Sequence, residues 1–126
     1  GALKLRARLL APGQVFDDFR PGRAAGDAAP EPLLLRRGQT ARLTVETIES
    51  HGYHVQRLHR HSGYTCVLKD LREKAVLSIR RPPGPLAAVP VRVPASLPRG
   101  RYTLEITTDT GAYQGKVTTR QPVLVR

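Results

Sequence analysis

Tryptophan and methionine are absent from this 126-residue sequence, and Cys66 is its only cysteine. A single cysteine excludes an internal disulfide, and it is compatible with a reducing compartment or with an exported bacterial protein. No apolar run reaches the roughly 18 residues of a membrane-spanning helix, so none is expected. Localisation stays open, and an exported or periplasmic location is the expectation for a bacterial source.

Signatures of catalysis are equally scarce. The sequence contains no G-x-S-x-G, H-E-x-x-H or P-loop motif. Its adjacent carboxylates, Asp17 and Asp18, would point apart on an extended chain and make a poor acid–base couple. We therefore expect a binding domain that is not an enzyme and has no resident cofactor.

A helical apolar period is also missing, whereas a period of two recurs along the chain. Apolar residues alternate with cations from Leu3 to Leu9, and similar alternation covers Ala41 to Val45, Val89 to Val93 and Tyr102 to Ile106. An Asp109-Thr110-Gly111 turn after the last of these predicts a hairpin. The expected fold class is all-β, one antiparallel sandwich domain of about seven to nine strands over residues 1–126.

Two further segments have a less regular pattern. Residues 11–32 are rich in proline and glycine and predict a long loop or arm, in which Phe16 and Phe19 are candidate apolar grips. Alternation in residues 53–58 and again in residues 64–68, separated by Ser62-Gly63, predicts a His-rich hairpin.

Partner contacts are expected at sheet edges. Proline cannot donate to a β-ladder, so Pro90 and Pro94 predict that the strand through Val89, Val91 and Val93 lies at an edge. The terminal strand is predicted to be a second edge. The candidate partner-binding residues are therefore Phe16, Phe19, Val89, Val91, Val123 and Val125.

Two motifs carry a resemblance to immunoglobulin-like domains. The run Leu97-Pro98-Arg99-Gly100-Arg101-Tyr102-Thr103-Leu104 resembles the P-x-G-x-Y-x-L start of a late strand in filamin-like and macroglobulin-like domains, where the tyrosine hydroxyl bonds to nearby backbone. Leu34-Leu35-Arg36-Arg37-Gly38-Gln39 is similar to a motif in the N-terminal sandwich of transglutaminases. The resemblance implies an immunoglobulin-like sandwich that serves as an accessory domain. The chain departs from the transglutaminase sandwich in lacking tryptophan and in having the Pro-rich arm.

Positive charge dominates, with 21 Lys and Arg against 10 Asp and Glu. A net charge of +11 attracts nucleic acids, acidic glycans or acidic proteins. A solvated outer face or the composition of a GC-rich genome would account for the same excess. The candidate polyanion-binding residues are Lys4, Arg6, Arg8, Arg36, Arg37, Arg57 and Arg60.

All four histidines are clustered shortly before Cys66 in the sequence, at His51, His54, His59 and His61. Imidazole suits Cu, Ni and Zn, and His59 and His61 would share one face of a strand with Cβ atoms roughly 7 Å apart. Against a metal site, the spacing matches no standard zinc motif and nearby arginines repel cations. A polar hairpin at a loop end is the alternative.

Three hypotheses follow. The leading one is a non-catalytic interaction module of a larger or exported protein, excised as a domain or released as a mature product, that binds another protein or domain. The alternatives are polyanion binding through the basic face and transition-metal binding through the histidines.

Overall fold

The computed structural model describes residues 2–10, 32–51, 54–58, 60–112 and 114–126. Within these ranges the chain is all-β, without a helix, and forms eleven strands. They are β1 (Ala2–Leu9), β2 (Leu33–Leu35), β3 (Thr40–His51), β4 (His54–Leu58), β5 (Arg60–His61), β6 (Tyr64–Lys69), β7 (Ala75–Arg81), β8 (Gly84–Pro85), β9 (Val89–Arg92), β10 (Gly100–Asp109) and β11 (Lys116–Val125). The count exceeds the expected seven to nine because β2, β5 and β8 are only two or three residues long.

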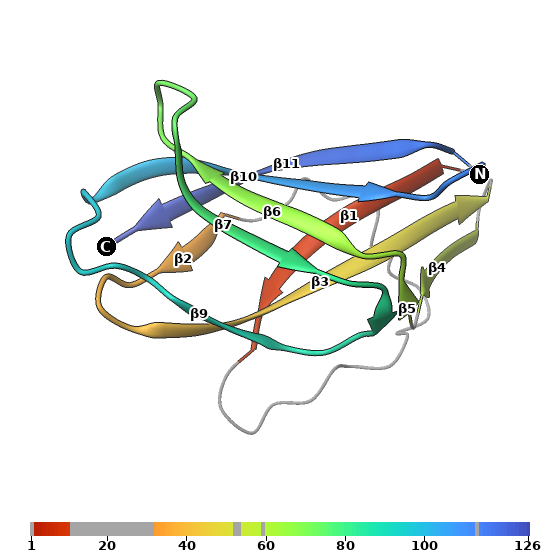
Figure 1. Cartoon of the computed structure of the whole chain (residues 1–126), viewed down its shortest axis with the longest axis horizontal. Helices are drawn as coiled ribbons and strands as arrows, with labels where there is room; N and C mark the ends of the chain where they lie inside the picture. Colours follow the sequence, from red (N-terminus) through yellow and green to blue (C-terminus); the bar gives the residue numbers. More distant parts are fainter. Residues whose placement is uncertain (1, 11–31, 52–53, 59, 113) are drawn as a thin grey trace.

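The strands form two main sheets (Figure 1). In the first, β3 pairs with β1 on one side and with β4 and β9 in succession on the other, all antiparallel. The second sheet has the order β2-β11-β10-β6-β7, in which only the β2–β11 pair is parallel. A small third sheet joins β5 to β8.

One hydrophobic core lies between the inner faces of the two main sheets. Leu5, Ala7 and Val45 come from the first sheet, while Leu104 and Ile106 come from the second, and all five are buried. Successive side chains of a strand point to opposite faces, which is why the period-two pattern of the sequence identified these residues correctly. Both faces of β3 are covered, because its outward-facing Thr44, Glu46 and Ile48 are also buried.

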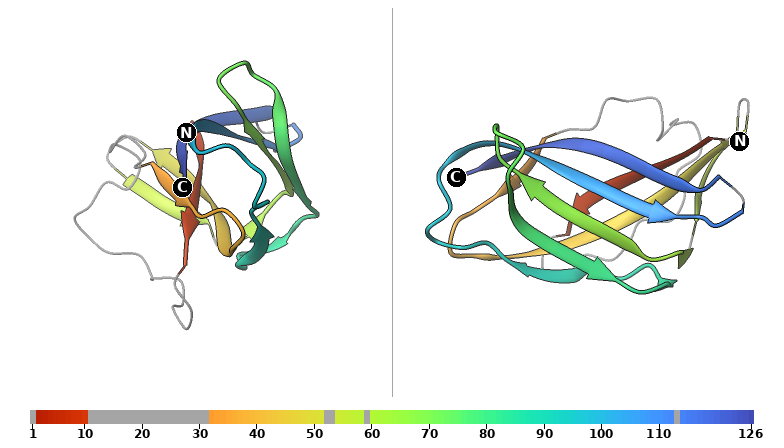
Figure 2. Two further views of the ribbon diagram at one scale, coloured as in Figure 1. Left: turned by 90° about the vertical axis from the view of Figure 1, so that its left-hand side faces the viewer. Right: turned by 45° about the horizontal axis from the view of Figure 1, so that its top comes forward.

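The five-stranded sheet is curled, and its strand β11 closes onto β1 (Figure 2). Gln121 on β11 accepts a hydrogen bond from the Ala7 N–H and donates one to the Ala7 carbonyl, both at 3.0 Å. Two residues away, the Leu5 N–H donates to Thr119 Oγ1 at 3.1 Å. A side-chain amide therefore completes the edge of β1 as a neighbouring strand would. We call this contact the closed seam.

Two strand pairings differ from the sequence prediction. The predicted His-rich hairpin is wrong, because β4 pairs with β3 whereas β6 pairs with β7 and β10. The terminal strand is not an edge near Val123 and Val125, since β10 and β2 flank it on both sides. Period-two alternation shows that a segment is extended, but carries no information on its partner.

Other predictions have simpler outcomes. The predicted arm at residues 11–32, with Phe16 and Phe19, lies outside the described residues apart from Pro32, which is exposed. The β10–β11 hairpin forms as expected, although its turn extends to Gly115, whose carbonyl accepts from the Thr110 N–H at 2.9 Å. No helix long and apolar enough to span a bilayer occurs in the described part of the chain.

Candidate functional site

The candidate site lies on the side of the molecule opposite the closed seam. There the first sheet ends in β9 and β4, and the second sheet ends in β7. Among the described residues, β7 has β6 as its only paired strand and β9 has β3. We call this side, with β7 and β9 at its two margins, the open seam.

The β9 edge is poorly suited to accept another strand. Val93 exchanges hydrogen bonds with the β3 side, donating to Gln39 O at 2.9 Å and accepting from Gly38 N at 2.8 Å. Alternation along an antiparallel ladder then directs the backbone of Pro90 and Arg92 outward. Pro90 has no N–H to offer, so this edge lacks a donor where a partner needs one. The predicted edge position of β9 is confirmed, but the side chains of Val89 and Val91 are buried in the core.

The β7 edge has none of these obstacles. Its seven residues contain no proline, and Pro82-Pro83 ends the strand immediately afterwards. Leu77 and Ile79 are only partly buried, although they pack against the core. Arg80 and Arg81 at its end are exposed. The sequence signalled this strand by the alternation around Leu77 and Ile79, but nothing in that pattern marked it as an edge.

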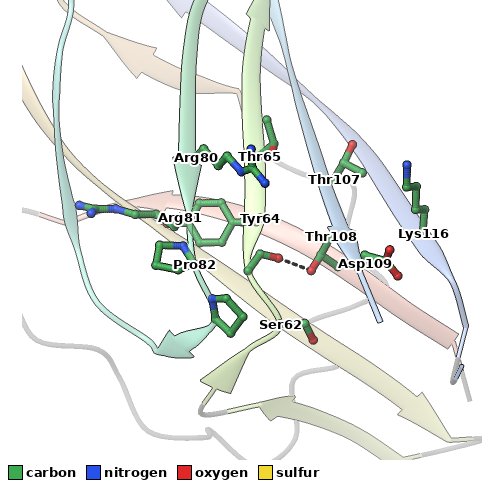
Figure 3. A pocket seen from close by; sticks show the side chains of 12 residues that line it. Ser62, Tyr64, Thr65, Arg80, Arg81, Pro82, Thr107, Thr108, Asp109 and Lys116 are labelled. Carbon is green, nitrogen blue, oxygen red and sulfur yellow. Dashed lines mark hydrogen bonds between the residues drawn. The ribbon is translucent and has the colours of Figure 1, made fainter. Parts of the chain in front are cut away.

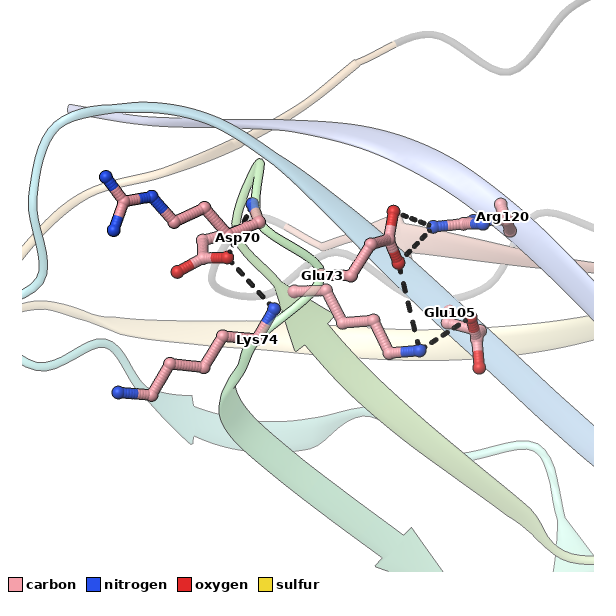
Figure 4. Close-up of polar contacts among 7 residues, drawn as sticks. Asp70, Glu73, Lys74, Glu105 and Arg120 are labelled. Atoms are coloured by element: carbon pink, nitrogen blue, oxygen red, sulfur yellow. Dashed lines mark hydrogen bonds and ion pairs between the residues drawn. The ribbon is translucent and has the colours of Figure 1, made fainter.

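The turn that connects β6 to β7 is well supported (Figure 4). Asp70 Oδ1 accepts hydrogen bonds from the backbone N–H groups of Arg72 at 2.8 Å and Lys74 at 3.0 Å. This closes residues 70–74 into a compact loop, within which Glu73 has a left-handed φ of 63°.

Ion pairs tie the same turn to the neighbouring strands. The Glu73 carboxylate accepts two hydrogen bonds from Arg120 Nη2 on β11, at 2.6 and 2.7 Å. Lys69 Nζ lies 3.1 Å from Glu105 Oε2 on β10 and 4.0 Å from Glu73 Oε2. The pKa of Arg120 is raised, chiefly by its hydrogen bond to Glu73. The network links the turn to two strands beyond β6 and so helps to hold the start of β7 in place.

A groove of about 660 Å³ adjoins the far end of β7 (Figure 3). Arg80 lies beside Thr65 on one wall, and Lys116 and Asp109 stand on the opposite wall. Thr108 Oγ1 donates to the Gly63 carbonyl and fixes the loop between β5 and β6 at the base. The lining residues are Ser62, Gly63, Tyr64, Thr65, Arg80, Arg81, Pro82, Pro83, Thr107, Thr108, Asp109 and Lys116.

The groove is electrostatically positive. Arg80, Arg81 and Lys116 are exposed and form no ion pair with any described residue. Asp109 is the one carboxylate in the lining, and its Oδ1 already accepts the Gly111 N–H at 2.8 Å. Arg80 and Lys116, with hydroxyl groups between them, form a surface suited to carboxylate, sulfate or phosphate oxygens, while the Arg81 side chain extends to the other side of β7 (Figure 3).

The predicted polyanion-binding residues do not form one surface. On β1, Lys4 is exposed and Arg6 and Arg8 are half-buried. Arg8 Nη1 lies 2.9 Å from Glu46 Oε1, and the Glu46 side chain is 1% exposed. The positive charge of the predicted residues on β1 is therefore partly neutralised by the buried carboxylate of Glu46.

The other predicted cations lie elsewhere. Arg36 and Arg37 belong to the turn before β3, where the Arg37 N–H donates to the carbonyl of Arg126 at 2.8 Å. Arg57 lies on β4, and its side chain is not among those that the structure describes. Arg60 is exposed on β5.

Of the predicted metal ligands, the structure describes the His61 side chain. His61 Nδ1 accepts the Gly63 N–H at 3.1 Å, and its ring contacts Tyr64 edge-on at a centroid distance of 4.9 Å. Burial, followed by the charge of Arg60, lowers the pKa of His61 below 6.5, which disfavours its protonation in the folded chain. His59 lies outside the described residues, while the backbones of His51 and His54 are paired where β3 ends and β4 begins.

Cys66 is unsuited to complete a metal site. Its side chain is 1% exposed in the core, and burial raises the pKa of the thiol to about 12. Metal ligation requires the thiolate, which burial therefore strongly disfavours. In the described part of the chain, no three His, Cys, Asp or Glu side chains come together as a metal-binding group.

No protein-family model matches the chain, and no curated protein sequence matches it significantly.

Proposed function

We propose that this chain is a non-catalytic, immunoglobulin-like interaction domain whose protein partner adds a β-strand to β7. The observation that carries the proposal is the edge of β7. It is seven residues long, contains no proline, and has no strand paired on its outer side among the described residues. Exposed edges of this kind accept extended peptides, because their free N–H and C=O groups supply a complete set of main-chain hydrogen bonds.

The immunoglobulin-like assignment has support from the corner before β10. The Tyr102 ring is buried, and its hydroxyl donates to the carbonyl of Pro98, four residues upstream, at 2.6 Å. This is the contact expected of a tyrosine corner in such sandwiches. Two facing sheets over one core also fit, whereas the curling of the second sheet is a departure from a regular sandwich.

Burial of apolar surface and the state of the competing edges favour pairing at β7 over the β1, β2 and β9 edges. A partner strand would bury the half-exposed side chains of Leu77 and Ile79, and burial contributes about 25 cal/mol per Å² of apolar surface. The β2 edge is only three residues long, and the β1 edge is occupied by Gln121 and Thr119.

The test compares two forms of one synthetic probe. The probe is a soluble nonapeptide of alternating valine and glutamate, and the second form carries N-methyl groups on alternate amides so that it cannot complete a ladder. Binding is followed by backbone amide shifts of the ¹⁵N-labelled domain. We expect shifts along β7 with the first form and none with the second. Equal binding of both forms, or shifts confined to other strands, would contradict strand addition.

A second candidate is polyanion binding, because many surface cations lack an acidic partner. Arg36, Arg99, Arg101 and Arg126 are exposed where β2, β10 and β11 meet at one end of the second sheet, and none forms an ion pair with a described residue. Retention on heparin should then fall steeply with salt, since binding releases condensed counterions. Charge-removing substitutions at Arg99 and Arg101 should weaken it, and a flat salt response would exclude this function.

A further inference from the structure

We infer that the strand accepted by β7 is acidic on one face, an extended segment whose residues alternate between apolar and carboxylate-bearing side chains. The inference rests on the proposed strand addition and specifies the chemistry of the partner. It follows from what β7 presents on its two faces and from the groove at its end.

The two faces of β7 differ in character. Leu77 and Ile79 are directed to the core side, where they pack against the hydrophobic cluster. Ser78 and Arg80 point to the opposite face and are exposed, with Ser78 opposite Val67 and Arg80 opposite Thr65 of β6. Side chains of a neighbouring strand alternate in the same way, so its inner residues would meet apolar groups and its outer residues would meet Arg80.

The cations near the end of β7 indicate which residue type the outward-facing positions of the partner strand should carry. Arg80 and Arg81 form no ion pair with any described residue, and Asp109, the one carboxylate of the described lining, lies across from Lys116 on the β10–β11 ladder. A carboxylate on a partner strand passing the end of β7 would therefore meet the guanidinium of Arg80 on the same face, and Arg can hold it with two hydrogen bonds. Lys116 lies on β11, on the far side of β6 and β10, and does not contact that strand.

A second copy of the chain fits this surface poorly. No acidic residue occurs from Lys74 to Arg81, and the whole chain carries a net charge of +11. Pairing two β7 strands would leave Arg80 and Arg81 without a counter-charge and would bring two strongly basic domains together. A linear polyanion such as a nucleic acid or a glycan offers charge, but it has neither a peptide ladder nor an apolar face for Leu77 and Ile79.

The experiment measures affinity with three nonapeptides, all capped at both ends. The first alternates valine and glutamate, the second has glutamine in place of every glutamate, and the third has the composition of the first with its valines and glutamates in two separate blocks. Each is titrated against the domain, against the double variant R80Q/R81Q, and against R101Q as a matched control. Arg101 is an exposed cation at the other end of the same sheet and forms no ion pair within the described part of the chain.

We expect the alternating acidic peptide to bind roughly two- to five-fold more tightly than its glutamine form, the gain from one exposed charge pair with Arg80. R80Q/R81Q should remove most of that difference, while R101Q should leave it unchanged. The blocked peptide should bind more weakly than the alternating one.

The possible failures are distinct. Equal affinity of the glutamate and glutamine forms, with shifts still along β7, would overturn the acidic partner while leaving strand addition intact. Equal affinity of the blocked and alternating peptides would show a general attraction for negative charge and would overturn the inference. A dimer paired through β7 in sedimentation and amide-shift measurements would identify a second copy as the occupant and would overturn it as well.

Discussion

The two seams of the molecule differ in whether their exposed strand edges are covered. At the closed seam, the edge of β1 is completed by the Gln121 amide and the Thr119 hydroxyl of β11. At the open seam, β7 has no such cover among the described residues, and β9 has Pro90 at an outward position instead. Edges exposed in this way are a hazard unless they are protected or used. The proposed strand addition assigns a use to the unprotected edge of β7.

The largest expected effect is at the closed seam. Gln121→Met keeps the side-chain volume but leaves the buried N–H and C=O of Ala7 without partners, and we expect a loss of about 2 to 4 kcal/mol in the free energy of unfolding. Thr119→Val removes a single acceptor and should cost less. Denaturant unfolding gives both values, and labelling of the buried Cys66 thiol should become faster in the less stable variant. A loss under about 0.5 kcal/mol for Gln121→Met would show that β1 does not depend on this amide.

A smaller effect is expected at the corner that leads from β9, on the open seam, to β10. Tyr102→Phe removes the hydrogen bond to Pro98 O and should cost about 1 kcal/mol. Tyr64→Phe is a matched control, because its hydroxyl forms no hydrogen bond with a described residue. Equal unfolding free energies of the two variants would contradict a stabilising role for the corner.

The contribution of the open seam to stability should also depend more on pH than that of the closed seam. Burial lowers the pKa of His61 below the 6.5 of an unfolded chain, so the unfolded state takes up a proton first and stability falls as pH drops through 6.5. The bonds of Gln121 and Thr119 do not titrate in this range. Unfolding free energies at about pH 7.5 and pH 5.5 should therefore differ less in His61→Gln than in the unaltered chain. An unchanged difference would assign the pH dependence to other groups.

The smallest effect is expected at the turn that supports β7. Arg120→Gln breaks the exposed pair with Glu73 and should lower the free energy of unfolding only slightly, less than any of the changes above. Its effect should diminish in high salt, because exposed charges are screened. Arg101→Gln is the matched control, because Arg101 forms no ion pair with a described residue. A larger loss of unfolding free energy in Arg101→Gln than in Arg120→Gln would show that the Glu73 pair is not stabilising.

Local pattern was sufficient for much of the fold. Alternation placed Leu5, Leu43 and Ile106 in the core correctly, and Pro90 marked an edge, because side-chain direction in a strand and the missing N–H of proline are local properties. Tyr102 was identified at its corner for the same reason, since its partner Pro98 is four residues away.

The candidate site was far less accessible to sequence reasoning. The polyanion-binding residues were predicted from the abundance of cations, yet Arg8 faces the buried carboxylate of Glu46. Arg80 and Lys116 were not predicted. They are 36 positions apart in the chain and line one groove. The predicted hairpin failed because β4 found its partner in β3 and β6 in β7 and β10. Such groupings depend on contacts between distant segments, which a single sequence does not record.

By itself the sequence determined an all-β chain, the inward-facing residues of its long strands, its strong positive charge and the hairpin after Asp109. Only the tertiary structure decided which strands are neighbours, and therefore that β1 is closed by Gln121 while β7 is left open. The physical reason is that strand alternation and turn conformation arise within a few residues. Pairing arises from the fit of whole sheets around a shared core, and it alone determines where an unpaired edge remains.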